Sequence, residues 1–210
     1  MTAENPEELL KPYGVSRESL AQLETYVSLL LTWQQRINLI GPSTVDTVWS
    51  RHILDAVQLI LLLPKNTKVI ADLGSGAGIP GLILAISGGY EVHLYESNGK
   101  KAAFLAEAIR QTGANAHVHQ IRLEQLAMTA ALPKADVIVA RALAPLDQLL
   151  RYSEPFFKWG ARAYFHKGQD LEAELTSATK YWRIKLDMHP SHSDSRGVIV
   201  EVKEAVRVRA

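Results

Sequence analysis

The sequence predicts an α/β fold in which helices alternate with the strands of a mainly parallel sheet. Short apolar runs such as residues 69–71 and 136–140 are typical of buried parallel strands, and helical patterns separate them. The last two apolar segments, residues 182–188 and 197–203, alternate apolar with polar residues and are joined by a polar linker. They predict an antiparallel hairpin that closes the sheet.

The N-terminal region is predicted to be helical. Residues 1–13 form a short helical lead that ends near Pro12. Ser16 is suited to cap the next helix, because a serine hydroxyl can accept a free backbone N–H there. The apolar residues of that helix recur close to the 3.6-residue period: Leu20, Leu23, Val27, Leu30 and Ile37.

A second N-terminal helix is expected after a break at residues 41–43, and it runs from about Thr44 to Leu63. We therefore divide the chain into an N-terminal helical cap, residues 1–64, and a larger α/β domain, residues 65–210, on which the cap packs.

The remaining elements alternate as expected for parallel strands with helical crossovers. The predicted strands are residues 91–96, 116–121, 136–140 and 160–167, and the predicted helices are residues 82–86, 100–109, 145–153 and 170–179.

The residues between the first strand and its helix form a candidate cofactor site. Glycine has no Cβ, so the chain can turn sharply and a ligand can lie against bare backbone. Pro80 suits the first turn of a helix, whose free N–H groups would face a ligand above the glycines. The candidate residues are Asp72, Gly74, Ser75, Gly76, Ala77 and Gly78.

Two cofactor classes fit this loop. Residues 76–81 match the dinucleotide pattern G-x-G-x-x-G, which is weak on its own. Asp72, two residues before the first glycine, resembles the acid in motif I of class I S-adenosylmethionine (SAM) methyltransferases, which helps orient the methionine end of the cofactor. Glu96 ends the next strand, where a carboxylate can accept hydrogen bonds from the ribose hydroxyls of either NAD or SAM. The alternatives are a glycine-rich turn without a ligand and an ordinary charge at a strand end.

Composition excludes several chemistries. The chain has 210 residues, 47% of them apolar, and no cysteine. There is therefore no disulfide, no thiolate nucleophile and no cysteine-ligated metal, and methylation of a pyrimidine carbon through cysteine is excluded. We expect no metal. The acidic N-terminus lacks a signal-peptide pattern, and residues 53–63 are too short and too polar to span a membrane. We expect a cytoplasmic protein without a membrane partner.

Charge is unevenly distributed along the chain. The net charge is +1, but residues 1–99 contain 6 Lys and Arg against 10 Asp and Glu, whereas residues 100–210 contain 17 against 12. A basic C-terminal half is compatible with phosphate binding, although most of its charges individually suit a solvated surface.

Arg51, His52 and Asp55 lie about one helical turn apart. Spacing alone favours an ion pair on the helix surface, worth a few tenths of a kcal/mol. The alternative places Arg51 and His52 at the cofactor cleft, in contact with substrate. Further along, Leu123 and Glu124 follow the third strand of the domain and are candidates to flank an adenine, Leu123 through backbone and apolar contact and Glu124 through its side chain.

Arg141 leaves the C-terminal end of the fourth strand of the domain, on the ligand side of an open α/β sheet. Enzymes that methylate exocyclic amines often carry an Asn/Asp-Pro-Pro-aromatic segment there. Residues 141–145 lack it, so methylation of an exocyclic amine is disfavoured. Guanine N7 already presents an in-plane lone pair and needs no general base, so orientation and electrostatics suffice. Arg141 could donate to guanine O6 or to a phosphate. The alternative is an ion pair at the strand end.

An ordered set of motifs resembles one family, ribosomal RNA small subunit methyltransferase G, formerly called glucose-inhibited division protein B. The resemblance spans about residues 28–203. Its motifs are Leu31-Thr-Trp33, Asn38-Leu39, residues 51–55 and 72–81, Lys100-Lys101, Phe104-Leu105, residues 122–124, Arg141-Ala142 and Lys167-Gly168.

The resemblance implies a Rossmann-like fold and a SAM-dependent enzyme that methylates guanine N7 in the decoding-region loop of 16S ribosomal RNA in the small subunit. It implies that Gly74, Ile79, Leu123, Glu124 and Arg141 contact SAM and that Glu96 binds the ribose. Arg141 is then the residue that positions guanine. The implied RNA-binding residues are Arg51, His52, Lys100, Arg141, Lys167 and Arg196. We expect a monomer.

The chain departs from the family pattern within the cap, at Gln34-Gln35, Ile40 and Ala56, and at Asn98-Gly99. The alternative functions are a SAM-dependent methyltransferase of a small molecule, a module that binds SAM or a nucleotide without turnover, and, less compatible with Asp72 and the terminal hairpin, an NAD dehydrogenase.

Overall fold

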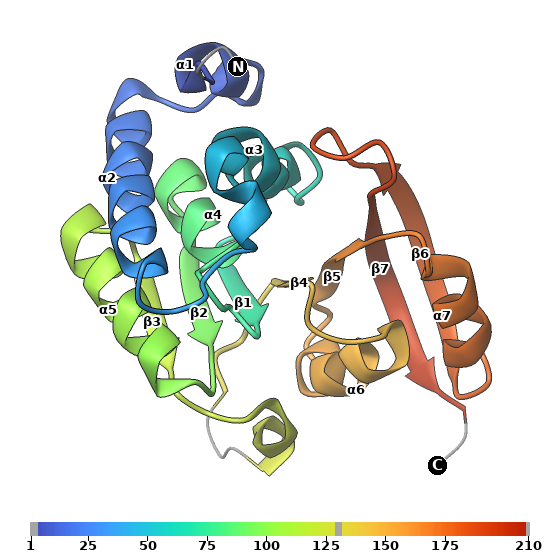
Figure 1. Ribbon diagram of the computed structural model, residues 1–210. Helices are drawn as coiled ribbons and strands as arrows, with labels where there is room; N and C mark the ends of the chain where they lie inside the picture. The colour runs from blue at the N-terminus through green and yellow to red at the C-terminus, as the bar shows by residue number, and fades with distance from the viewer. Residues whose placement is uncertain (1–3, 129–131, 209–210) are drawn as a thin grey trace.

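The computed structural model describes residues 4–128 and 132–208, and within these ranges it contains a seven-stranded sheet with helices on both faces (Figure 1). The strand order is β3-β2-β1-β4-β5-β7-β6; β7 runs antiparallel to β5 and β6, and the other pairs are parallel. The predicted α/β class and the closing hairpin are confirmed. The strands are β1 (Val69–Leu73), β2 (Glu91–Tyr95), β3 (Ala116–His119), β4 (Val137–Arg141), β5 (Arg162–Lys167), β6 (Trp182–Pro190) and β7 (Val198–Arg207).

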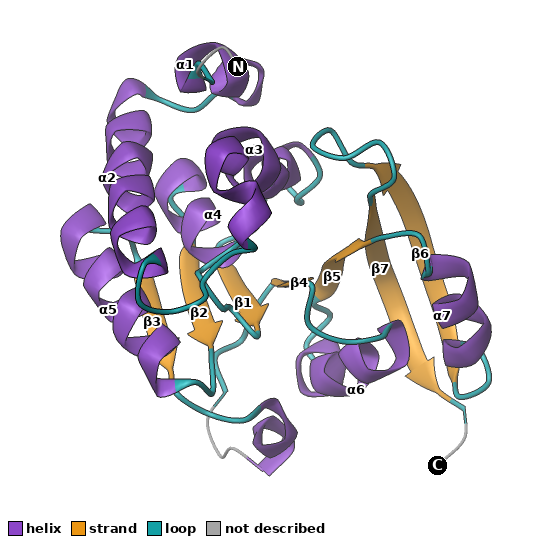
Figure 2. Cartoon of the chain, in the orientation of Figure 1, coloured by secondary structure: helices purple, strands orange, loops and turns teal. Residues whose placement is uncertain are grey.

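Alternate residues of each parallel strand face two different apolar layers, because successive side chains of a strand point to opposite faces of the sheet. Ile70 packs in the layer with α2 (Arg17–Gln34), α4 (Gly81–Gly88) and α5 (Gly99–Thr112). Its neighbour Ala71 packs in the layer with α6 (Leu146–Phe157) and α7 (Leu171–Ala178). Figure 2 shows the sheet between these groups of helices.

The N-terminal helices share a core with the sheet. The lead forms α1 (Pro6–Leu10) and a 3₁₀ turn, and Ser16 caps α2 as predicted, its Oγ accepting the Ser19 N–H at 3.0 Å. The buried face of α2, including Tyr26 and Leu30, belongs to the same apolar cluster as Phe104 of α5. The division into a cap of residues 1–64 and a domain of residues 65–210 stays a prediction, but the packing joins the two parts closely.

The second N-terminal helix is not continuous, and the prediction of one helix from Thr44 to Leu63 is wrong. The segment consists of a 3₁₀ helix (Pro42–Thr47), a π-helical turn (Trp49–Ile53), α3 (Leu54–Val57) and a second 3₁₀ helix (Gln58–Leu61). His52, Asp55 and Gln58 are buried polar residues in this segment. Buried polar groups need partners. His52 and Gln58 each have one partner inside this segment and one on another element, β4 for His52 and the β6–β7 linker for Gln58.

The linker between β6 and β7 returns to the N-terminal helices. The Ser191 and Ser193 hydroxyls hydrogen-bond Asp55, and the His192 N–H donates to Gln58 Oε1 at 2.7 Å. Figure 1 shows this loop beside α3 at the top of the molecule. The β6–β7 linker thus holds the segment that contains Asp55 in place.

Among the described residues, no helix is both long enough and apolar enough to cross a membrane.

Candidate functional site

The loop after β1 has the backbone geometry that the glycine pattern predicts. Gly74, Gly76 and Gly78 have φ angles of +68°, +57° and +86°, in the left-handed region that favours glycine. A Cβ on Gly74 would lie 2.5 Å from a methyl group of Leu143, but one on Gly76 would meet only a carbonyl oxygen at 3.9 Å. The space above Gly76 is therefore open to a ligand. Tyr26 of α2 supports the loop, because its hydroxyl donates a hydrogen bond to the Ala77 carbonyl at 2.7 Å.

Asp72 supports this loop from inside the protein. Its Oδ2 accepts the Gly81 N–H at 3.1 Å, whereas its Oδ1 is buried without a partner among the described residues. Burial raises the pKa of Asp72 to about 7. A Cβ on Gly81 would lie 2.5 Å from the carboxylate, so glycine is needed for this close approach. Asp72 does not line any of the three cavities described below.

Glu96, at the end of β2, lies on the opposite side of the same loop. Its Oε2 accepts the Gly76 N–H at 2.9 Å and its Oε1 accepts the Asn98 N–H at 2.7 Å. A carboxylate has about four lone-pair positions, so two further hydrogen bonds remain possible. Glu96 lines a cleft of about 410 Å³, which we call the large cleft because the two cavities beside it are smaller.

The large cleft is formed at the C-terminal ends of four adjacent parallel strands, where open α/β sheets bind ligands. Its residues come from the loops after β1, β2, β3 and β4: Gly74, Gly76, Tyr95, Glu96, Ser97, Ile121, Arg122, Leu123, Glu124 and residues 142–145, with Lys101 of α5 and Gln148 and Tyr152 of α6. The predicted residues Leu123 and Glu124 thus share a cleft with Glu96. Glu124 is held by the Tyr152 hydroxyl at 2.7 Å, a bond that lowers the pKa of Glu124.

Two smaller cavities continue from the cleft. The middle cavity, of about 260 Å³, shares Gly74, Gly76, Lys101 and Ala142 with the large cleft, and is also lined by residues 39–41, His52, Ser75, Ala77, Ile79 and Arg141. The outer cavity, of about 270 Å³, shares Arg141 and Ala142 with the middle one, and is lined by Arg51, Asp55, residues 166–168, Ser191, Asp194, Gly197 and Val198. The three cavities therefore lie side by side along the C-terminal edge of the sheet.

Arg141 stands where the middle and outer cavities meet, and three groups hold its guanidinium. Its Nε lies 2.8 Å from Asp55 Oδ2, its Nη1 lies 2.8 Å from His52 Nδ1, and its Nη2 donates to the Arg51 carbonyl at 3.1 Å. Three of its five N–H donors are thus used for orientation, and two are left for a ligand. The next residue, Ala142, has a positive φ of 50°, which turns the chain sharply at this point.

His52 serves Arg141 as a neutral acceptor. Burial, together with the charge of Arg141, lowers the pKa of His52 to about 4. Because Nδ1 accepts from Arg141, the ring proton is on Nε2, which donates to Thr44 Oγ1 at 2.7 Å. Its acceptor nitrogen is therefore occupied.

Asp55 contradicts the interpretation of a surface ion pair with Arg51. It is buried and pairs with Arg141, while Arg51 pairs with Asp194 at 2.9 Å. Burial opposes the charge of Asp55, but His166, Arg141 and the two linker serines outweigh it and lower its pKa. Arg51 lines the outer cavity and His52 lines the middle cavity, and their contact with substrate stays a prediction.

Comparisons with known proteins identify the family of this chain. Residues 19–196 match the family model GidB, described as rRNA small subunit methyltransferase G. The chain belongs to this family of rRNA methyltransferases. It is 48% identical to ribosomal RNA small subunit methyltransferase G of Paramagnetospirillum magneticum, over 98% of both chains, and 46% identical to that of Rhodospirillum rubrum, over 96% of this chain and 98% of the other.

The fold is that of class I SAM-dependent methyltransferases. Similar solved structures include M. jannaschii TYW2 in complex with AdoMet, with a TM-score of 0.54 and 13% identity over 83% of this chain and 80% of that one. The fibrillarin/Nop5p complex gives a TM-score of 0.53 and 11% identity over 71% and 80%. These likenesses concern the fold.

The predicted RNA-binding residues of this family member differ in location, exposure and ionic partners. Arg51 and Arg141 line the outer cavity, but each is paired with a carboxylate. Lys167 lies there too, with its side chain only 9% exposed, 2.6 Å from Glu174 and 3.1 Å from the Ala144 carbonyl. Arg196 is exposed on the β6–β7 linker, 3.7 Å from Asp194. Lys100 is exposed at the start of α5 and has no ionic or hydrogen-bond partner through its ammonium group in the described part of the chain.

Sequence reasoning missed several residues at this methyltransferase's site, among them Lys101 and Asp55. Lys101 lines both the large cleft and the middle cavity, whereas the neighbouring Lys100 was the candidate. The periodicity of α5 offered a signal, since Lys101 lies three residues before the buried Phe104. Asp55, the partner of Arg141, was assigned to a surface pair, and nothing in its local spacing indicates a partner on β4.

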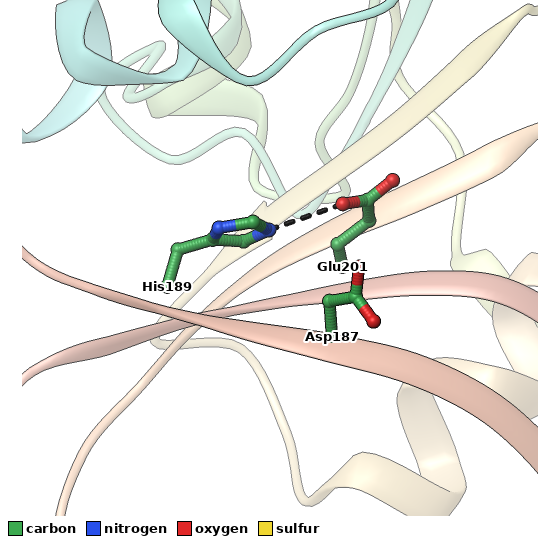
Figure 3. A group of neighbouring side chains, drawn as sticks. All are labelled: Asp187, His189 and Glu201. Atoms are coloured by element: carbon green, nitrogen blue, oxygen red, sulfur yellow. Dashed lines mark hydrogen bonds and ion pairs between the residues drawn. The ribbon is translucent and has the colours of Figure 1, made fainter.

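A separate group of metal-ligand types lies on the terminal hairpin of the enzyme. Asp187, His189 and Glu201 place ligand atoms within 4.8 Å of one another, and Figure 3 shows His189 directed at Glu201. Glu201 accepts from His189 at 3.0 Å and from Arg162 at 3.1 Å, and Asp187 pairs with Lys203. These contacts account for the group as an ion-pair network within the protein.

Proposed function

We propose that this chain transfers a methyl group from SAM to N7 of a specific guanosine. This guanosine lies in the decoding-region loop of the 16S ribosomal RNA of the small ribosomal subunit. The observation that supports this proposal is the row of adjoining cavities from Glu96 to Arg141, which we call the path. One end of the path suits a nucleoside, and the other presents an oriented cation.

SAM fits the nucleoside end. Drug-sized ligands occupy pockets of about 300–1,000 Å³, and the large cleft falls in this range. Glu96 would hold the ribose with its spare lone pairs, Leu123 and Glu124 would flank the adenine, and the open backbone of residues 74–79 would lie against the methionine portion. Asp72 would act through the loop. When bound, SAM supplies an electrophilic methyl group on a positively charged sulfur.

The acceptor end favours a base that needs no deprotonation. Two possible bases beside Arg141 are already engaged, since the unprotonated nitrogen of His52 accepts from Arg141 and the carboxylate of Asp55 binds Arg141 and two serines. Guanine N7 carries its own lone pair, so positioning is the main requirement. The remaining donors of Arg141 would hold guanine O6 or a neighbouring phosphate.

The proposal is tested by transfer of tritiated methyl groups into small subunits, or free 16S RNA, from a strain that lacks the modification. We expect label in 7-methylguanosine after nuclease digestion, mapped to one position in the decoding region. Label in another nucleoside would contradict N7 specificity. Label only in a small metabolite would contradict the RNA substrate. SAM binding without any methyl transfer would contradict an enzymatic function and favour a module that only binds SAM.

A further inference from the structure

A fourth cavity lies between the C-terminal end of α2 and the start of α5. It has a volume of about 450 Å³ and is lined by Thr32, Trp33, Arg36, Ile37, Lys100 and Ala103. We call it the Trp33 cavity. The Trp33 ring packs edge-on against buried Phe104, with ring centroids 5.7 Å apart and an interplanar angle of 64°. The core thus holds the indole in place at the cavity wall.

The Trp33 cavity carries unpaired positive charge. Arg36 and Lys100 are exposed, and neither side chain has a hydrogen-bond or ion-pair partner among residues 4–128 and 132–208. By contrast, Arg51, Arg141 and Lys167 of the outer cavity are all paired with carboxylates of the protein. Uncompensated cations beside an apolar and aromatic wall are the features of sites that bind single-stranded nucleic acid, where bases stack and phosphates meet basic side chains.

This cavity adjoins the proposed site of methyl transfer on two sides. Ile37 of its wall is followed within four residues by Leu39, Ile40 and Gly41, which line the middle cavity. Lys100 of its wall is followed by Lys101, which lines both the middle cavity and the large cleft. The Trp33 cavity therefore lies within reach of nucleotides that flank a guanosine in the middle cavity.

We propose that the Trp33 cavity binds an unpaired base of the RNA substrate close to the methylated guanosine, stacked against Trp33 and Ile37, with the adjoining phosphates on Arg36 and Lys100. This inference rests on the proposed function for the identity of the substrate. The charge of the cavity distinguishes RNA from an apolar peptide segment, which would leave both cations unmatched.

Cross-linking tests the location without requiring turnover. The photoreactive residue p-benzoylphenylalanine is placed at exposed Ala103, and in a control at exposed Arg183 on β6, far along the sheet order from the cleft. Each protein is irradiated with unmodified small subunits and S-adenosylhomocysteine. We expect the Ala103 protein to cross-link to RNA within a few nucleotides of the methylated guanosine and the Arg183 protein not to. Cross-links to ribosomal protein alone, or to RNA elsewhere, would overturn the proposal.

Kinetics test the chemistry of the cavity. Trp33→Leu keeps an apolar contact to Phe104 but removes the stacking face, and Arg36→Ala removes one phosphate contact. We expect each to raise KM for small subunits, Trp33→Leu by about tenfold, because loss of base stacking has an effect of about this size. Arg36→Ala should reduce the slope of log affinity against log salt by about 0.7. SAM affinity should stay within twofold, and Arg183→Ala should behave as wild type.

Two failures can be told apart. If wild type methylates guanine N7 but both variants have wild-type KM and salt dependence, the Trp33 cavity is not an RNA site and the proposed function stands. If wild type fails to methylate RNA, the proposed function fails, and an Ala103 cross-link to a distant nucleotide or to none refutes the cavity's role as well.

Discussion

The buried carboxyl group of Asp72 predicts a specific dependence of stability on pH. Its pKa is raised by burial from 3.8 to about 7 in the folded protein. The folded state therefore binds more protons than the unfolded state between these values, and stability is highest below the unfolded pKa and is lost as pH rises through about 7. Linkage with these two values gives a loss of about 2–3 kcal/mol in the free energy of unfolding between pH 5 and pH 8.

Asp72→Asn isolates this contribution. Asparagine keeps an oxygen that can accept the Gly81 N–H but has no titratable proton. Urea unfolding followed by tryptophan fluorescence, at pH 5 and pH 8 without ligand, gives the free energy of unfolding of both proteins. From pH 5 to pH 8, we expect the free energy of unfolding of the variant to rise by about 2–3 kcal/mol relative to that of wild type, whatever the difference between the two proteins at pH 5.

Asp136→Asn is the matched control. Asp136 also accepts backbone N–H groups at a strand end, from Lys68 and Val69, but it is exposed. Comparing the two variants separates the burial of Asp72 from the loss of a carboxylate that binds backbone N–H groups. If Asp72→Asn showed no relative gain, the carboxyl group would be ionised in the folded protein without a burial cost, and the role of Asp72 as an internal support of the loop would be wrong.

Three further substitutions test the site. Arg141→Lys should slow methyl transfer at least about tenfold while SAM affinity measured by calorimetry stays within twofold, because lysine cannot donate in three directions with the guanidinium geometry; unchanged turnover would remove Arg141 from the proposed role. Gly76→Val should abolish SAM binding in the same calorimetric assay, since its φ of +57° strains a β-branched residue and the side chain enters the open space; wild-type affinity would contradict the location of the cofactor. Lys167→Met should lower the free energy of urea unfolding by about 3 kcal/mol, because Glu174, which is poorly exposed, keeps the Leu146 N–H but loses its cation; lower RNA affinity at unchanged stability would instead assign Lys167 to RNA.

The parts of the fold that were predicted correctly depend on short-range chemistry. An apolar strand followed by alternate glycines and Pro80 specifies a strand, turn and helix within about 20 residues, and the structure contains β1, the loop and α4 there. The hydroxyl of Ser16 needs only the N–H of Ser19 to cap α2. The large cleft follows from the same logic, because parallel strands bring their C-terminal ends, and so Glu96 and Leu123, to one edge.

The errors arise where a local partner competes with a distant one. Asp55 lies one turn from Arg51, so sequence spacing favours their pairing, but an exposed pair of this kind contributes only a few tenths of a kcal/mol. Burial changes the balance, because a carboxylate removed from water requires a cation and hydrogen-bond donors close by. Arg141 supplies the cation from 86 residues away, and the linker serines supply the donors from more than 130 residues away. The periodicity of the sequence cannot predict contacts over such distances.

The orientation of Arg141 therefore depends on three segments folding together. The π-helical turn and α3 supply the carbonyl of Arg51, the ring of His52 and the carboxylate of Asp55, and β4 supplies Arg141 itself. The β6–β7 linker completes the set by hydrogen-bonding Asp55 through its serines. Because α2 also supports the glycine loop through Tyr26, the N-terminal helices contact both ends of the path between cofactor and acceptor. We infer that they belong to the catalytic machinery and not to a separable appendage, since their removal would leave Arg141 without its three partners and the glycine loop without its support.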